Sequence, residues 1–161
     1  MNRDDDGRRD FDFILGKWKI HNSRLKLRLQ NCTEWQEFEA RHEGRPTLGG
    51  LGNVDSFSVA TFPLDGRPLE GMSIRTFDPR TRLWSIWWLD DRSFHVQPPV
   101  AGRFEGARGE FFGDEIIDGR PTRVRFIWSD VDTPSPRWEQ AFSIDGGKTW
   151  ETNWRSVLTR A

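Results

Sequence analysis

Short runs of β-branched and aromatic residues alternate with turn-forming sequences along most of the chain. Strands joined by tight turns give this pattern, because such side chains favour a pleated, half-buried surface. The clearest turns contain Asp-Gly or Asp-Pro pairs, at 63–68, 78–81, 118–121 and 145–147. The intervening runs predict ten strands, at 18–28, 33–43, 47–60, 69–77, 83–90, 100–106, 108–117, 121–130, 136–143 and 148–159.

The connections between these strands are short, which predicts antiparallel up-and-down order, since parallel neighbours need long crossovers. Closing the sheet removes its edges, so we expect an all-β fold with a single barrel of about 8–10 strands. Before the first strand, Asp10 is expected to cap a short helical turn that stops at Gly16. The predicted domain spans residues 10–161, after a flexible tail at 1–9, and the long connection at 91–99 could form a lid.

Aromatic side chains recur on one face of several of these strands. In the strand at 83–90, for example, Trp84, Ile86 and Trp88 share one face. If these faces point inward, they form an aromatic wall with a few polar groups, as a small-molecule pocket requires. The predicted pocket residues are Trp35, Trp88, Trp128, Trp138 and Trp154, with Asn53, Arg75, Arg125 and Gln140 as polar anchors.

Charged residues on three strands leave two interpretations open. Glu37, Asp55 and Arg75 each share a face with aromatic residues of their own strand. If those faces point inward, Arg75 needs a carboxylate partner such as Asp55 or Glu37, because a lone buried charge is costly. The same residues could form an exterior charge ladder between neighbouring strands, which is the interpretation we favour from the sequence.

Composition narrows the classes of partner. The net charge is −1, with 24 Lys and Arg against 25 Asp and Glu, so neither nucleic acid nor an anionic membrane is expected as a partner. No apolar run approaches the roughly 20 residues of a membrane helix, and Met1–Asp10 lacks the apolar segment of a signal peptide. The single cysteine, Cys32, is expected to be a buried, inert thiol in a reducing cytoplasm.

Two sequence features resemble known barrels. Gly16-Lys17-Trp18, directly after the helical turn, resembles the Gly-x-Trp signature of lipocalins. In that superfamily the Trp closes one end of the barrel and an Arg from the last strand packs over it, which implies this role for Arg155 or Arg160. Over most of its length the chain also resembles a bacterial family of lipocalin-like (calycin) domains of unknown function, through segments that include 11–18, 32–35, 49–55, 77–79, 83–86 and 138–143. This resemblance implies a fold and no reaction.

Other motifs have structural explanations. The segment Ser143–Trp150 matches the Asp-box pattern of propeller proteins, but a single copy predicts only a self-stabilised hairpin. The glycines of 49–53 lack the Lys-Ser/Thr of a phosphate loop and predict a bend or bulge. His21, His42 and His95 are far apart and form no metal motif, so we expect no metal and no cofactor.

Three functions remain open. The preferred one is binding of a small, partly aromatic or apolar molecule inside the barrel, because ten strands leave a cavity whereas eight are filled by side chains. The second is a cofactor-independent lyase, isomerase or cyclase, in which Arg75 or Arg125 polarises a carbonyl. Its proton would be moved by Glu37, Asp55 or His95. The third is a filled barrel acting as an interaction module; Trp87, opposite Trp88, suggests a homodimer seam in any of these cases.

Overall fold

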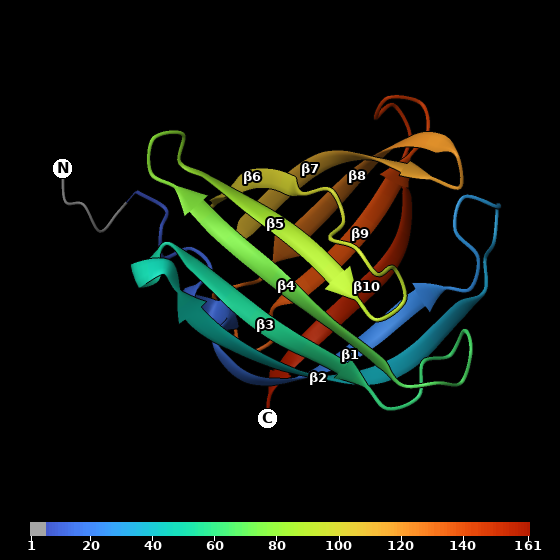
Figure 1. Cartoon of the computed structure of the whole chain (residues 1–161), viewed down its shortest axis with the longest axis horizontal. Helices are drawn as coiled ribbons and strands as arrows, with labels where there is room; N and C mark the ends of the chain where they lie inside the picture. Colours follow the sequence, from blue (N-terminus) through green and yellow to red (C-terminus); the bar gives the residue numbers. More distant parts are fainter. Residues whose placement is uncertain (1–5) are drawn as a thin grey trace.

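A computed structural model, which describes residues 6–161, contains ten antiparallel strands in one closed barrel (Figure 1). Around the barrel the order is β1-β10-β9-β8-β7-β6-β5-β4-β3-β2, so each strand pairs with its neighbour in sequence and the last pairs with the first. The predicted up-and-down topology is confirmed. The strands are β1 Gly16–Leu25, β2 Trp35–Thr47, β3 Gly52–Val59, β4 Leu69–Asp78, β5 Leu83–Asp90, β6 Val100–Glu105, β7 Arg108–Ile117, β8 Arg120–Ser129, β9 Arg137–Ser143 and β10 Glu151–Arg160.

Alternating burial along each strand sets the inner and outer faces of the barrel. In β2, Phe38, Ala40 and His42 are buried while the residues between them are exposed. The register follows from this pattern, because a slip by one residue would turn every inner side chain outward. In β1 the same alternation turns Trp18, Ile20, Asn22 and Arg24 inward.

One end of the barrel is closed by the N-terminal segment. The 3-10 helix η1, Asp12–Ile14, places Phe11 and Ile14 in the core, and Trp18 Nε1 donates a hydrogen bond to the Ile14 carbonyl at 3.1 Å. The guanidinium of Arg160, on β10, lies 3.7 Å from the centre of the Trp18 ring. Of the two arginines that the resemblance suggested for this position, Arg160 therefore occupies it.

Two details at this end differ from the sequence predictions. The N-cap position of η1 is Phe11, one residue after the predicted Asp10. Residues 6–9, expected to belong to a flexible tail, lie against the barrel: Trp84 Nε1 donates to the Gly7 carbonyl at 2.9 Å. The rest of the predicted tail, residues 1–5, lies outside the described residues.

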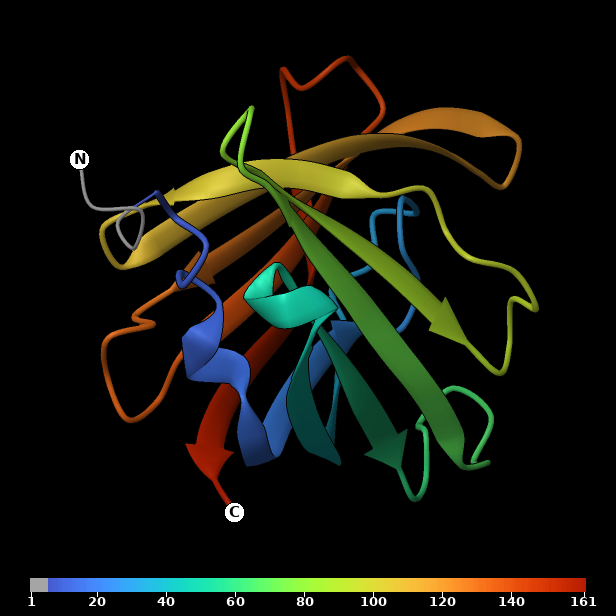
Figure 2. The ribbon, with the colours of Figure 1, turned by 60° about the vertical axis from the view of Figure 1, so that its left-hand side comes forward.

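The turns follow the predicted chemistry. The 3-10 turn η2, Leu48–Gly50, joins β2 to β3 with positive φ angles of 63° at Gly49 and 92° at Gly50, so the glycines do form a bend. In the Asp-box segment, Asp145 Oδ1 accepts hydrogen bonds from the amides of Lys148 (3.0 Å) and Thr149 (2.9 Å), as expected for a self-stabilised hairpin. Figure 2 shows η1 in blue and η2 in cyan at the same end of the barrel.

Two further observations concern features singled out in the sequence. Cys32 lies in the connection between β1 and β2 and is only partly buried, because it projects from a loop and not from an inner strand face. In the described part of the chain, no helix has the length and apolar character needed to cross a membrane.

Candidate functional site

A cavity of about 570 Å³ occupies the barrel interior. It extends from Ile14, at the closed end, to the connections 60–68 and 91–99 at the opposite end, which form its mouth. The volume lies within the roughly 300–1,000 Å³ that is typical of small-molecule pockets. Its aromatic lining consists of Phe57, Phe62, Trp88, Phe126, Trp128, Trp138, Phe142 and Trp154.

The aromatic rings hold one another in place. Trp138 packs edge-on against Phe126, with ring centres 5.1 Å apart, and against Trp154 at 6.0 Å. Trp88 lies over Gly71 of the neighbouring strand, where an added Cβ would come within 2.3 Å of the indole. The glycine therefore makes room for the ring, and the cavity wall is fixed before any ligand binds.

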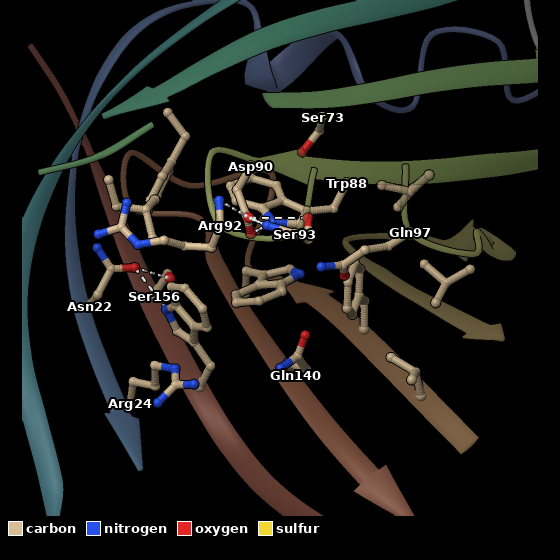
Figure 3. Close-up of a pocket in the computed structure, with 18 of the residues that line it drawn as sticks. Asn22, Arg24, Ser73, Trp88, Asp90, Arg92, Ser93, Gln97, Gln140 and Ser156 are labelled. Carbon is tan, nitrogen blue, oxygen red and sulfur yellow. Dashed lines mark hydrogen bonds between the residues drawn. The ribbon is translucent and has the colours of Figure 1, made fainter. Parts of the chain in front are cut away.

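Two uncharged polar side chains in the wall, Asn22 and Gln140, form hydrogen bonds with neighbours on the adjacent strand. Asn22 Oδ1 accepts hydrogen bonds from Ser156 Oγ (2.7 Å) and Trp154 Nε1 (3.0 Å), which joins β1 to β10. Gln140 Nε2 donates to Asn153 Oδ1 at 2.8 Å. Figure 3 shows Asn22, Trp88 and Gln140 on different sides of the cavity.

A charged cluster lies on the cavity wall toward the closed end. Arg75 Nη1 is 2.6 Å from Asp55 Oδ2 and donates to Asn53 Oδ1 at 2.9 Å. The second oxygen of Asp55 accepts a hydrogen bond from the Ser73 amide at 2.9 Å. His42 Nε2 approaches Asp55 Oδ2 at 3.1 Å without hydrogen-bond alignment. All five residues are buried, so the carboxylate neutralises an otherwise isolated cation.

The surroundings of Asp55 lower its pKa. Burial alone would raise it, but the positive charge of Arg75, the contact with His42 and the Ser73 amide outweigh burial and bring the pKa from 3.8 to about 2. Asp55 is therefore ionised at neutral pH. A carboxylate with so low a pKa is a weak base, so its role in this cluster is to hold Arg75 and His42.

This cluster corrects the interpretation favoured from the sequence. Asp55 and Arg75 do not form an exterior ladder: both are buried on the inner face, and they pair diagonally across β3 and β4. Glu37, by contrast, is exposed on the outer face of β2. There Glu37 and Glu39 both contact His21, and the hydrogen bond that His21 Nδ1 donates to Glu39 is the main cause that raises the pKa of His21.

Two arginines lie near the mouth. Arg24 projects inward from β1, and Arg28 projects from the connection between β1 and β2; both line the cavity. The guanidinium of Arg24 lies 5.6 Å from the Trp154 ring centre, and that of Arg28 lies 5.0 Å from the Phe142 ring centre. The mouth thus carries positive charge beside aromatic rings.

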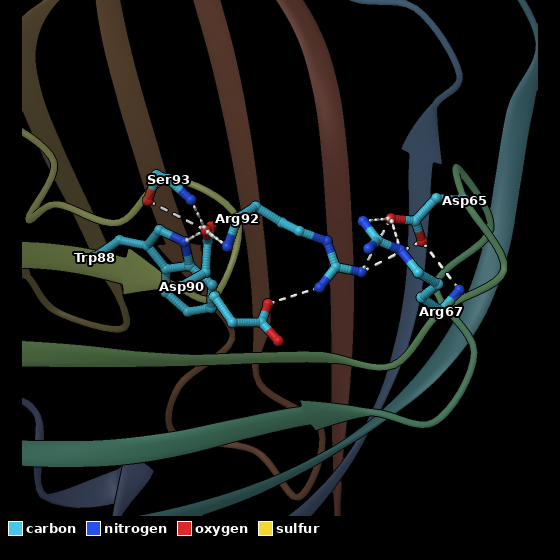
Figure 4. A network of polar contacts seen from close by, with 7 residues as sticks. Asp65, Arg67, Trp88, Asp90, Arg92 and Ser93 are labelled. Carbon is cyan, nitrogen blue, oxygen red and sulfur yellow. Dashed lines mark hydrogen bonds and ion pairs between the residues drawn. The ribbon is translucent and has the colours of Figure 1, made fainter.

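An ion pair joins the two connections that form the mouth. Arg92, in 91–99, contacts Asp65, in 60–68, at 3.1 Å, and also Asp91 at 2.7 Å (Figure 4). The start of the 91–99 connection is held by Asp90, which accepts hydrogen bonds from Trp88 Nε1 at 2.8 Å and from the Ser93 amide at 2.9 Å. The 91–99 connection, which the sequence suggested as a lid, is therefore joined by an ion pair to the 60–68 connection at the mouth.

The structure brings together most of the predicted pocket residues. Trp35 and Arg125, however, lie on the outer face: Arg155 stacks on Trp35 at 4.7 Å, and Arg125 stacks on Trp150 at 4.5 Å. Neither lines the cavity: Trp35 has the opposite parity to the buried residues of β2, and Arg125 has the opposite parity to the residues of β8 that line the cavity, Val124, Phe126 and Trp128. Asn53 lies behind Arg75 and supports it. The predicted residues that line the cavity are Arg75, Trp88, Trp128, Trp138, Gln140 and Trp154.

Sequence reasoning missed several ionisable residues of this cavity, among them Arg24, Arg28 and His42. Arg24 and His42 share the inward parity of the apolar residues beside them, Ile20 and Phe38, so alternation could have identified both. Arg28 lies in a loop, where alternation gives no signal. Within residues 6–161, no group of three or more His, Cys, Asp or Glu side chains is arranged to hold a metal ion.

Comparison with known proteins assigns the chain to no family: no family model matches it, and no curated protein matches it.

Proposed function

We propose that this barrel, of lipocalin-like type, binds a small, partly aromatic or apolar molecule in its central cavity. The observation that carries the proposal is the cavity of about 570 Å³ with its wall of interlocked aromatic side chains. A filled barrel would use those rings to occupy the interior, so the open volume argues against a purely structural or interaction role. Satisfied polar groups such as Asn22 and Gln140 can orient a ligand without rearranging.

Native mass spectrometry of the gently purified protein tests this proposal. We expect a small-molecule adduct, either retained from purification or acquired during incubation with a broad metabolite extract. The same spectrum gives the subunit count and so tests the homodimer suggested by Trp87. Bare protein under both conditions would contradict the binding function.

A cavity-filling substitution gives the matched control. Ser73 lines the cavity from β4, whereas Ser58 is exposed on the outer face of β3. Ser73→Phe should abolish the adduct, because it places a ring in the binding volume, while Ser58→Phe should leave it unchanged. Equal adduct levels in the two variants would mean that the molecule binds elsewhere.

The second candidate is a cofactor-independent lyase, isomerase or cyclase, and one observation favours it. His42 lies on the cavity wall, 3.1 Å from Asp55, and neither of its ring nitrogens makes a hydrogen bond within the described structure. A histidine in contact with a carboxylate can act as a general acid or base. If the bound molecule is chemically changed, His42→Gln should stop the change and leave binding intact; a wild-type protein that returns the molecule unaltered would contradict catalysis.

A cytoplasmic location, expected from the single cysteine, stays a prediction, and Cys32 is the residue on which it depends.

A further inference from the structure

Arg24 is a buried cation with no counter-ion among residues 6–161. The residue is 7% exposed, and its Nη1 donates one hydrogen bond, to the Leu25 carbonyl at 2.8 Å. Its Nε is buried without a hydrogen-bond partner, and no carboxylate of residues 6–161 comes within ion-pair distance of it. A buried charge left in this state is costly, so its presence in a cavity wall requires an explanation.

Arg28 brings a second positive charge to the same region. Its connection is anchored to the barrel, because the Leu29 amide donates to Glu151 Oε1 at 2.8 Å and Arg120 donates to the Leu29 carbonyl at 3.3 Å. Burial, together with the charge of Arg28, lowers the pKa of Arg24 to about 9. Arg24 therefore remains protonated at neutral pH, and two like charges face one cavity.

The other charged groups of the cavity are already engaged. Arg75 is paired with Asp55, and Arg92 with Asp65. Asp90 accepts hydrogen bonds from its own end of the 91–99 connection. Glu115 also lines the cavity, and burial raises its pKa. Burial lowers the pKa of Arg28, and the charges of Glu115, Asp118, Glu151 and Asp90 oppose that effect from beyond ion-pair distance. None of these acids makes an ion pair with Arg24 or Arg28 in the described structure.

We infer that the ligand of this cavity is an amphipathic organic anion, whose acidic head contacts Arg24 and Arg28 and whose apolar body lies on the aromatic wall; this rests on the proposed binding function. A guanidinium presents paired donors that match two oxygens of a carboxylate, sulfonate or phosphate ester. The aromatic rings beside both arginines, Trp154 and Phe142, continue from this polar end into the cavity. In Figure 3, Arg24 and Asn22 lie on one side of the cavity and Gln97 on the other.

Two fluorescent probes separate charge from shape. 8-Anilinonaphthalene-1-sulfonate is an anion, and N-phenyl-1-naphthylamine has the same ring system without the sulfonate. Each is titrated into the full chain and into Arg24→Met, Arg28→Met and Arg24→Lys. The matched control is Arg108→Met, because Arg108 lies exposed at the outer surface of β7, where it pairs with Glu110. Circular dichroism establishes that each variant is folded.

We expect the wild type to bind the sulfonate more tightly than the neutral probe. Arg24→Met and Arg28→Met should each weaken sulfonate binding by about 10- to 100-fold, the range for loss of a charge-assisted hydrogen bond. Binding of the neutral probe should change little in either variant. Arg24→Lys should fall between wild type and Arg24→Met, since it keeps the charge and loses the paired donors. Arg108→Met should match the wild type with both probes.

The outcomes distinguish this inference from the function on which it rests. If the wild type binds both probes equally and the two arginine variants do not discriminate between them, the anion inference is overturned and the binding function stands. If neither probe binds, both are overturned.

The origin of the anion is resolved by competition. Dodecanoate and naphthalene-2-carboxylate are each compared with their methyl esters as competitors for bound sulfonate probe. Displacement by the acid but not by its ester supports the inference. The acid that displaces more probe at equal concentration shows whether the apolar body of the ligand is aliphatic or aromatic. Equal displacement by acids and esters overturns it.

Discussion

Asp55 is the residue whose removal most directly tests the buried charge cluster. Asp55→Asn keeps an oxygen that can accept the hydrogen bond from the Ser73 amide, at 2.9 Å in the wild type, and removes only the negative charge. Arg75 then loses the carboxylate oxygen at 2.6 Å and keeps Asn53 as its hydrogen-bond partner. The side chains of Arg75 and Asp55 are only 5% and 2% exposed, so bulk solvent compensates little for the lost charge.

Removing one partner of a buried ion pair costs about 3–5 kcal/mol, because the other charge is left uncompensated. We expect a loss of that size in the free energy of unfolding at pH 7. Since small domains are stable by only about 5–15 kcal/mol, the loss is a large fraction of the total. Urea unfolding followed by tryptophan fluorescence measures it, provided that the denaturant dependence keeps the wild-type slope.

The pH dependence gives a second reading of the same interaction. The pKa of Asp55 is lowered from 3.8 to about 2, so its contribution is complete well above pH 3.8 and is lost as the pH falls through 3.8 and then through 2. That shift corresponds to roughly 2–3 kcal/mol. The stability difference between wild type and Asp55→Asn should therefore shrink between pH 5 and pH 2.

Two further variants decide between a charge effect and a general loss of packing. Adding Arg75→Met to Asp55→Asn removes the stranded cation and should recover part of the stability. Asp114→Asn, at an exposed position of β7, should change stability by less than about 0.5 kcal/mol. A loss below about 1 kcal/mol for Asp55→Asn, or a double variant no more stable than the single one, would refute the reasoning.

Three other predictions concern the mouth of the cavity. Arg24→Met should raise the free energy of unfolding of the ligand-free protein by about 1 kcal/mol in thermal or urea denaturation, because it removes an unpaired buried charge; a loss of stability would contradict this. Arg92→Ala should speed release of a bound fluorescent probe in stopped-flow experiments, because it breaks the 3.1 Å contact with Asp65 that joins the two connections. An unchanged release rate would show that this ion pair does not limit exit of the probe. Glu115→Gln should tighten binding of the sulfonate probe severalfold at pH 7, because it removes a negative charge from a wall shared with Arg28, whereas equal affinities would place the probe's head elsewhere.

The strands of this barrel could be predicted because their information is local. All ten lie where runs of β-branched and aromatic residues fall between turn signals. Simple alternation identifies the residues of β9 that line the cavity, Trp138, Gln140 and Phe142. The largest boundary difference is at β3, expected from residue 47 and found from Gly52, because Leu48, Gly49 and Gly50 adopt positive φ angles and bend the chain. The glycines in the sequence indicate a bend, but the residue at which the strand is interrupted depends on the backbone angles.

The candidate site was harder to predict because it depends on register and on which face of each strand points inward. Alternation identifies two faces and does not say which is inner when both carry aromatic residues. Trp35 and Trp150 are outer residues covered by Arg155 and Arg125, a packing that a sequence pattern cannot distinguish from an inner wall. In β10 a register shift between Thr152 and Trp154 also separates Trp150 from the inner face.

The pairing of Asp55 with Arg75 also could not be predicted from the sequence, because an electrostatic rule alone does not show which strand face points inward. An inward Arg75 required a carboxylate, and Asp55 was one of two candidates, but the exterior ladder satisfied the same electrostatic rule. The register of β3 against β4 places Asp55 opposite Ser73 and Asn53 opposite Arg75, and the burial of Asp55 (5% exposed) and Arg75 (4% exposed) shows that this face points inward. That register is set by contacts across the sheet and is not encoded in either strand alone.

The buried arginines at the two ends of the cavity differ in their partners, and this difference bears on function. At the closed end, Arg75 has a carboxylate and an amide oxygen as partners, an arrangement that is stable without any ligand. Near the mouth, Arg24 has one backbone carbonyl and no carboxylate within the described residues. Stability alone would favour a pair or an apolar side chain at that position. A charge kept unpaired where the cavity meets its opening is therefore better explained by a partner that arrives from solution, and proteins depart from stable local choices mainly at functional sites.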